Sequence, residues 1–204
     1  MAAEIMKPIL FNTEMVKAIL EGRKTVTRRV VKPRSKNACG FYVVTRHSDG
    51  AFMGVYDYDE NEMMYENSQT PPVNVGDVLY VRETWYKGLN RILYKADYSE
   101  NEKFYTNGKE IIVKWKPSIH MPKEAARIFL KVTDVRVEKL QEIDIEGIRN
   151  EGLSSMAVHA GDMEIALEEW KILWDSTIKK DKMEFYGWEA NPYVWVIEFE
   201  KINI

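Results

Sequence analysis

Gly22 separates an amphipathic helix from the most basic stretch of the chain. Asn12 or Thr13 can cap this helix, and apolar residues recur at helical spacing as far as Leu20. A glycine directly after the last apolar position is typical of a left-handed helix terminator, which turns the backbone sharply. Residues 26–31 then predict a strand. We therefore expect a helix, a tight turn and a strand in immediate succession.

Positive charge is concentrated around this turn. Between residues 17 and 36, eight Lys or Arg residues stand against one Glu, a local formal charge of +7, whereas the whole chain has a formal net charge of −3. A slightly acidic molecule has no general attraction for polyanions, so any contact with nucleic acid is expected to be local. Residues 57–66 carry five acidic residues and no basic one, which predicts a solvated acidic loop.

The remaining pattern predicts several strands, then helices, then a final strand. Strands are expected at 77–85, 127–137 and 193–202, with weaker candidates at 92–98 and 111–115, and helices from Asp144 to Gly152 and after Asp162. Residues 37–72 form either a hairpin excursion or a loose loop. This order indicates the α+β class rather than a doubly wound sheet. A length of 204 residues with 45% hydrophobic content suits one domain.

The cysteine, histidine and N-terminal patterns exclude several classes of protein. A lone Cys39 cannot form an internal disulfide, and His47 and His159 have no partner at metal-ligand spacing. We therefore expect neither a metal nor a cofactor. Residues 1–7 show no charged leader followed by an apolar run, and no segment approaches 18 consecutive apolar residues. These features favour a cytoplasmic protein without a membrane partner.

The segment from Ile19 to Arg29, ILEGRKTVTRR, resembles the signature of the ASCH domain family. Three further segments agree in order: Gly76 to Arg82, Asn150 to Leu153, and Tyr193 to Phe199. The overall length is most similar to that of the longer ASCH proteins of phages and prophages. The resemblance implies one PUA-like mixed β-barrel over residues 1–204, with flanking helices. Inserted hairpins or loops are then expected at about 37–72 and 86–122, which the smallest members lack.

ASCH domains are similar in fold to PUA-type RNA-binding modules, and some small bacterial members resemble amidohydrolases of N4-acetylcytidine. Matched motif to motif, the residues of those enzymes fall on Lys24, Thr27 and Glu151. The trio makes chemical sense for acyl transfer, with Lys24 as general base, Thr27 as nucleophile or water-positioning hydroxyl, and Glu151 as proton shuttle. The alternative is a structural role. Lys24 and Thr27 would then shape the turn, and Glu151 would pair with a basic side chain to hold its helix on the barrel.

Further basic and aromatic residues are candidates for ligand contacts. Arg23 and Arg29 flank the motif and are expected to help hold an anionic ligand. Arg82 and Trp85 belong to a predicted strand whose two faces both mix polar with apolar residues, as in a barrel strand that ends at a pocket. Trp85 is either a base-stacking residue or part of the core. His120, in a loop-like segment, either reaches the pocket or bonds the backbone.

Arg28 departs from the small amidohydrolases, which carry an apolar residue at this position. An added guanidinium can bind a phosphate, which favours a nucleotide or RNA over a free nucleoside. The sequence leaves three hypotheses. The first is a basic pocket that binds a modified nucleobase, nucleotide or single-stranded RNA without chemistry, and the second is the metal-independent amidohydrolase. The third is a protein-interaction module that uses the acidic residues 57–66.

Overall fold

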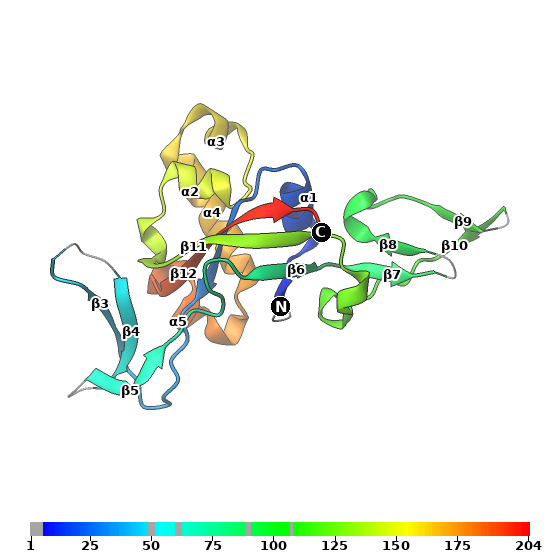
Figure 1. Ribbon diagram of the computed structural model, residues 1–204. Helices are drawn as coiled ribbons and strands as arrows, with labels where there is room; N and C mark the ends of the chain where they lie inside the picture. Colours follow the sequence, from blue (N-terminus) through cyan, green and yellow to red (C-terminus); the bar gives the residue numbers. More distant parts are fainter. Residues whose placement is uncertain (1–5, 49–51, 60–62, 89–90, 107) are drawn as a thin grey trace.

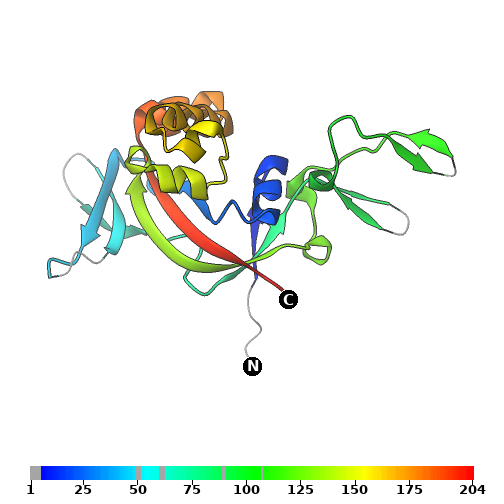
Figure 2. The ribbon, with the colours of Figure 1, turned by 90° about the horizontal axis from the view of Figure 1, so that it is seen from above.

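A five-stranded mixed sheet forms the centre of the computed structural model, which describes residues 6–48, 52–59, 63–88, 91–106 and 108–204 (Figure 1). Its strands, in spatial order, are β1 (Lys7–Leu10), β6 (Val78–Arg82), β11 (Phe129–Lys139), β12 (Tyr193–Ile202) and β2 (Val26–Val30). β1 runs parallel to β6, and the other neighbours are antiparallel. The two longest strands, β11 and β12, bend together into an arc (Figure 2).

The mixture of sheets and helices confirms the α+β class. The central sheet is open among the described residues, so the β-barrel that the resemblance implies is not seen as a closed one. In the described residues β1 and β2 are the two edges, and no ladder joins them. β1 has only four residues, and the chain between the two edge strands forms helix α1 (Thr13–Leu20). Side chains link the edges instead: Arg29 Nη2 donates to the Leu10 carbonyl at 2.9 Å, and the Arg29 guanidinium lies 5.4 Å from the Phe11 ring centre.

Helix α1 (Thr13–Leu20) begins and ends where the sequence predicts. The Asn12 side chain accepts a hydrogen bond of 2.8 Å from the Met15 amide, which satisfies one free donor of the first turn. Gly22 has φ +76°, the left-handed conformation expected of a terminator. The helix buries Val16 and Ile19 against the sheet. The basic turn therefore leaves the end of a helix that packing holds in place.

A β-bulge in β11 decides which of its side chains lie on each face of the sheet. The register with β12 shifts between Val132 and Asp134, so one residue is unpaired there. Val132 before the bulge and Val135 after it both pack in the first core. Asp134 and the alternate residues that follow it are thereby turned to the opposite face. A regular strand over 127–137, as the sequence predicts, would have placed Asp134 in the core.

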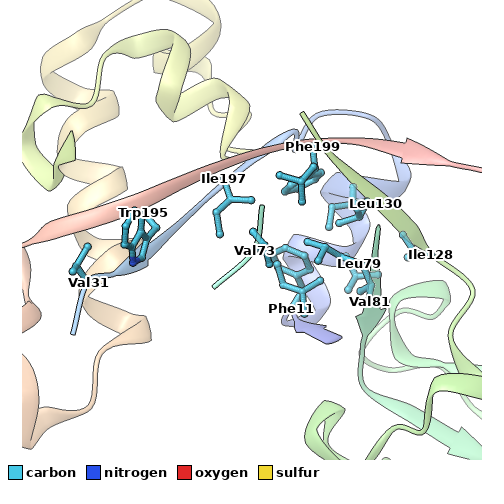
Figure 3. Packing of buried hydrophobic residues seen from close by; sticks show 14 of the residues in the cluster. Phe11, Val31, Val73, Leu79, Val81, Ile128, Leu130, Trp195, Ile197 and Phe199 are labelled. Carbon is cyan, nitrogen blue, oxygen red and sulfur yellow. The ribbon is translucent and has the colours of Figure 1, made fainter. Parts of the chain in front are cut away.

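Two cores lie on opposite faces of the sheet. The first packs between one face, α1 and the chain near Val73, and Figure 3 shows its apolar side chains gathered beneath β12. The second packs between the other face and helices α2 (Ile145–Asn150), α3 (Met156–Ala160) and α4 (Met163–Thr177). Alternation along β12 divides the strand between them, because Trp195 belongs to the first core and Val196 to the second.

The three helices follow from local signals with one exception. Asp144 caps α2 by accepting from the Gly147 amide at 2.7 Å, and Asp162 caps α4 by accepting from the Ile165 amide at 3.2 Å, as predicted. The short α3 was not predicted; Ser155 caps it and Gly161 ends it. In the described part of the chain, no helix is long and apolar enough to cross a membrane.

The two expected insertions form small sheets at opposite ends of the molecule (Figure 2). For residues 37–72 the hairpin alternative is correct, because β3 (Gly40–Thr45), β4 (Phe52–Tyr58) and β5 (Met63–Gln69) form an antiparallel sheet. The second insertion holds two hairpins, β7 (Trp85–Lys87) with β8 (Ile92–Tyr94) and β9 (Phe104–Thr106) with β10 (Lys109–Ile111). The strand predicted over 77–85 is therefore interrupted after Arg82, and the one predicted over 111–115 ends at Ile111.

Short helical elements complete the chain. They are the 3-10 helices Lys95–Asp97, Ser118–His120, Lys123–Ala125, Leu140–Glu142, Lys180–Lys182 and Trp188–Ala190, and the single-turn helix α5 (Met183–Tyr186).

Asp57 is not part of a solvated loop, contrary to the prediction for 57–66. Its side chain is buried, accepts from the Arg34 and Ser35 amides at 2.8 and 2.7 Å, and accepts from Gln69 Nε2 at 2.6 Å. Residues 60–62 of the predicted loop lie outside the described residues. Asp57 therefore anchors the inserted sheet to the chain that leaves β2, which removes it from the proposed interaction surface.

Substitution of Gly152 tests how closely the chain after α2 packs against α1. Both Gly152 and Gly161 have positive φ, at +98° and +75°, but a Cβ on Gly152 would lie 2.9 Å from Ala18 Cβ and 3.0 Å from Lys24 Cβ, whereas Gly161 faces open space. We expect both alanine variants to lose about 1–2 kcal/mol to backbone strain. Gly152→Ala should lose about 1–3 kcal/mol more through overpacking. Urea unfolding measures both, and equal losses would contradict the close approach.

Candidate functional site

The basic turn meets the end of α2, far along the chain. Lys24 and Glu151 form an isolated antiparallel bridge, and the Thr25 amide donates to the Asn150 carbonyl at 2.9 Å. Arg23 Nη1 donates to the Gly152 carbonyl from the other side of the bridge. The turn after Gly22 and the positive φ of Gly152 bring the two backbones together. Residues 127 positions apart thus become neighbours.

Lys24 lies wholly inside the protein. Its side chain is 0% exposed, and Nζ donates to Glu151 Oε2 at 2.6 Å, to the Glu151 carbonyl at 2.9 Å and to the Val26 carbonyl at 2.8 Å. Burial lowers the pKa of Lys24, and the charge of Glu151 opposes this change. Three acceptors match the three protons of an ammonium group, whereas a neutral amine would leave one acceptor without a donor. The geometry therefore favours the charged form.

Arg28 shares the carboxylate of Glu151 with Lys24. Its side chain is 3% exposed; Nη1 donates to Glu151 Oε1 at 3.3 Å, and Nη2 donates to Glu138 Oε2 at 3.3 Å. The Nε atom of Arg28 is buried without a hydrogen-bond partner. A guanidinium that already faces two carboxylates is poorly disposed to bind a phosphate, in contrast to the expectation for this residue. Its unpaired Nε instead requires an acceptor.

A pocket of about 230 Å³ lies between α2 and the sheet, with Arg28 in its wall. The lining residues are Val26, Arg28, Arg136, Glu138, Glu142, Asp144, Glu146, Gly147, Asn150 and Glu198. Five carry a carboxyl group and two a guanidinium group. Arg136 donates to Asp134, Glu138 and Glu198, so its charge is compensated within the protein. The pocket is therefore acidic, whereas the sequence predicts a basic one.

The structure brings together two of the three residues of the predicted catalytic set and places the third on another face of the sheet. Lys24 and Glu151 are in contact, but neither lines the pocket. Thr27 is buried and pairs with Ile197 in the sheet, and alternation along β2 directs it to the face opposite Arg28. Within the part of the chain that the structure describes, no hydrogen bond joins the Thr27 side chain to Lys24 or Glu151.

The flanking arginines hold structural contacts. Arg23 Nε donates to Glu21 Oε2 at 2.7 Å, and its Nη1 donates to the Gly152 carbonyl. Arg29 lies on the opposite face of β2 from Arg28 and links the two sheet edges. Arg23 therefore ties the turn to the chain after α2, whereas Arg29 ties β2 to the end of β1, and neither lines the pocket.

Arg82, Trp85 and His120 gather at the far end of β6, and none of them lines the acidic pocket. Arg82 Nη2 donates to the carbonyl of Ile119, the residue before His120. Trp85 is 5% exposed and packs with Met121 in a third core cluster, so the packing alternative describes its position. His120 is exposed. Arg82 and Trp85 therefore hold the second insertion against the sheet.

The pocket carboxylates were not predicted from the sequence. Glu138 and Glu198 come from β11 and β12, and Glu142 and Glu146 flank the start of α2. The available signal was the run of alternate polar residues Asp134, Arg136 and Glu138, which points to one polar face. Among the described residues, no group of three or more His, Cys, Asp or Glu side chains is arranged to hold a metal ion.

Removing the charge of Glu151 tests its role as the shared counterion. In Glu151→Gln, Lys24 and Arg28 remain buried but lose the negative charge that they share. We therefore expect a loss of about 3–5 kcal/mol in the free energy of unfolding. The matched control is Glu146→Gln, because Glu146 forms an exposed pair with Arg149 within α2, and such pairs contribute about 0–1 kcal/mol. Denaturant titration at pH 7 compares the two. A similar, small loss for both would show that the network is not structurally important.

Comparison of the chain with models of protein families, with curated proteins and with solved structures gave no match in any of the three. Function is therefore inferred from the geometry of the site and from the sequence motifs that form it.

Proposed function

We propose that this chain is an ASCH-type, PUA-like protein whose acidic pocket binds a modified nucleobase or nucleoside as a recognition module without chemistry. The observation that carries the proposal is the unpaired, buried Nε of Arg28 among the pocket carboxylates. This atom has no acceptor within the protein, and the carboxylates, which each accept one or more bonds within the protein, have further lone pairs that can accept from a ligand. A nucleobase edge offers both an acceptor and a donor, as cytosine does with its exocyclic amino group beside ring acceptors.

The charge of the pocket narrows the class of ligand. Five carboxyl groups repel a phosphate, and the two guanidinium groups are already paired. A volume of about 230 Å³ is below the range of pockets that enclose whole drug-sized ligands, which matches a single base. We therefore expect a nucleoside or an unpaired base to enter the pocket and any attached phosphate to stay outside it.

Calorimetric titration with N4-acetylcytidine, cytidine and cytidine 5′-monophosphate tests the proposal. We expect a nucleoside to bind, and the monophosphate to bind no more tightly than cytidine. Arg28→Lys keeps a positive charge but removes Nε, so affinity should fall about ten- to hundredfold, as for the loss of a hydrogen bond from a charged group. The matched control is Arg29→Lys, the neighbouring arginine on the opposite face of β2, which should bind like the wild type.

Two results would contradict the proposed recognition. One is tighter binding of the monophosphate than of cytidine that is weakened in Arg28→Lys, which would place a phosphate in the pocket. The other is the same affinity in Arg28→Lys and Arg29→Lys. Unfolding temperatures of both variants, measured in parallel, separate lost recognition from lost folding.

The amidohydrolase is the second candidate, and the contact between Lys24 and Glu151 favours it. A lysine whose pKa is lowered by burial, beside a carboxylate, is a combination that can move protons. It ranks second because Lys24 is fully enclosed and Thr27 points to the other face of β2. In this mechanism Lys24 would first pass its proton to Glu151, and the neutral amine would then take the Thr27 hydroxyl proton as the oxygen attacks the acyl carbon. Glu151 would give its proton to the leaving amine, and water would then release the acyl group from Thr27 as the free acid.

Release of cytidine from N4-acetylcytidine and its longer-acyl analogues, followed by chromatography, tests the second candidate. If the chain is a hydrolase, the wild type turns these substrates over and Thr27→Val, which preserves the shape of the side chain, does not. Turnover that persists in Thr27→Val would remove Thr27 from the mechanism. No turnover by the wild type would exclude the hydrolase for these substrates.

A further inference from the structure

A second hollow, of about 310 Å³, lies between the inserted β3–β5 sheet and the segment that leads into β12. Its lining residues are Val31, Gly40, Phe41, Tyr58, Lys139, Phe185, Tyr186, Ala190, Asn191, Pro192 and Tyr193. We call this hollow the aromatic cleft. In Figure 1, α5 and the inserted sheet lie on the same side of the molecule.

Five of the eleven residues that line the aromatic cleft carry an aromatic ring. Phe41 meets Tyr193 edge to face, with 6.3 Å between ring centres. Tyr58 lies so close to the backbone of Gly40 that a Cβ there would be 2.7 Å from Tyr58 Cε1. Phe185, at the other wall, is 59% exposed. Held rings on one side and an exposed ring on the other provide a place for a further flat ring.

The charge of the aromatic cleft is the reverse of that of the acidic pocket. Lys139 Nζ lies 3.9 Å from the centre of the Tyr193 ring, and Lys182 Nζ lies 5.9 Å from that of Phe185. The described lining of the cleft contains no carboxyl side chain. An ammonium group fixed over one wall and another beside the opposite wall attract an anion. The cleft therefore combines stacking surfaces with positive charge.

We propose that the aromatic cleft binds an unpaired base of single-stranded nucleic acid, with Phe185 stacking on the base and Lys139 and Lys182 contacting flanking phosphates. Aromatic rings interleaved with cations are the recurring means of holding single strands, because every base has a face that can stack. A paired base is not free to enter. The proposal does not depend on the acidic pocket, since the neighbours Glu138 and Lys139 of β11 face opposite sides of the sheet.

Fluorescence anisotropy with labelled eight-residue oligouridylate and oligothymidylate tests this site. We expect the wild type to bind at low salt, with little competition from a duplex. Phe185→Ala should weaken binding about five- to hundredfold, as for the loss of one base–aromatic stack, and Phe185→Tyr should retain it. The matched control is Tyr105→Ala, which removes a 61% exposed ring on β9, away from the cleft. Lys139→Gln should reduce the salt dependence of binding.

The outcomes are distinct from those of the proposed function. Binding of either oligonucleotide that depends on Phe185 supports the inference, and a difference between the two probes shows that the 2′-hydroxyl or the 5-methyl group contributes. No oligonucleotide binding by the wild type would overturn it, as would equal affinities of Phe185→Ala and Tyr105→Ala. Binding of an acidic octapeptide but not of the oligonucleotides would replace it with a peptide site. Phe185→Ala should leave nucleoside titrations unchanged.

Discussion

The buried ion pair between Lys24 and Glu151 is the interaction on which the position of α2 over the sheet depends. It joins the turn after α1 to the end of α2 at 2.6 Å, and Arg28 completes it from β2. Burying an ion pair adds little net stability, but removing one partner is costly because the other charge is then buried alone. The pair therefore specifies one position for α2 over the sheet, and that position creates the acidic pocket.

The same network explains why a stretch with a local charge of +7 does not make a basic pocket. Lys24 and Arg28 face Glu151, Arg23 faces Glu21, and Arg29 bridges the sheet edges on the other side. The strongest concentration of cations in the sequence is thus used in assembling the fold. The surface proposed to bind an anion lies instead at the aromatic cleft, beside the C-terminal end of β11, where Lys139 and Lys182 lie over aromatic rings.

Local signals in the sequence predicted the elements that hold the site. The caps Asn12, Asp144 and Asp162 and the terminator Gly22 are confirmed, because each acts within a few residues of the chain. The open sheet and the bulge after Val132 could not be predicted in this way, since they depend on pairing between distant strands. Without that bulge, Arg136 and Glu138 would not share the pocket face. Periodicity assigns residues to one face of a strand or helix, but it does not decide which other element that face packs against.

A double-mutant cycle on Lys24 and Glu151 tests most directly whether this pair holds α2 on the sheet. The free energy of unfolding is measured for the wild type, Lys24→Met, Glu151→Leu and the double variant, which replaces the charged pair with apolar side chains. We expect a large loss in each single variant, a partial recovery in the double variant, and a coupling energy of about 2–3 kcal/mol. Additive losses, with a coupling below about 0.5 kcal/mol, would show that the pair does not hold α2 in place.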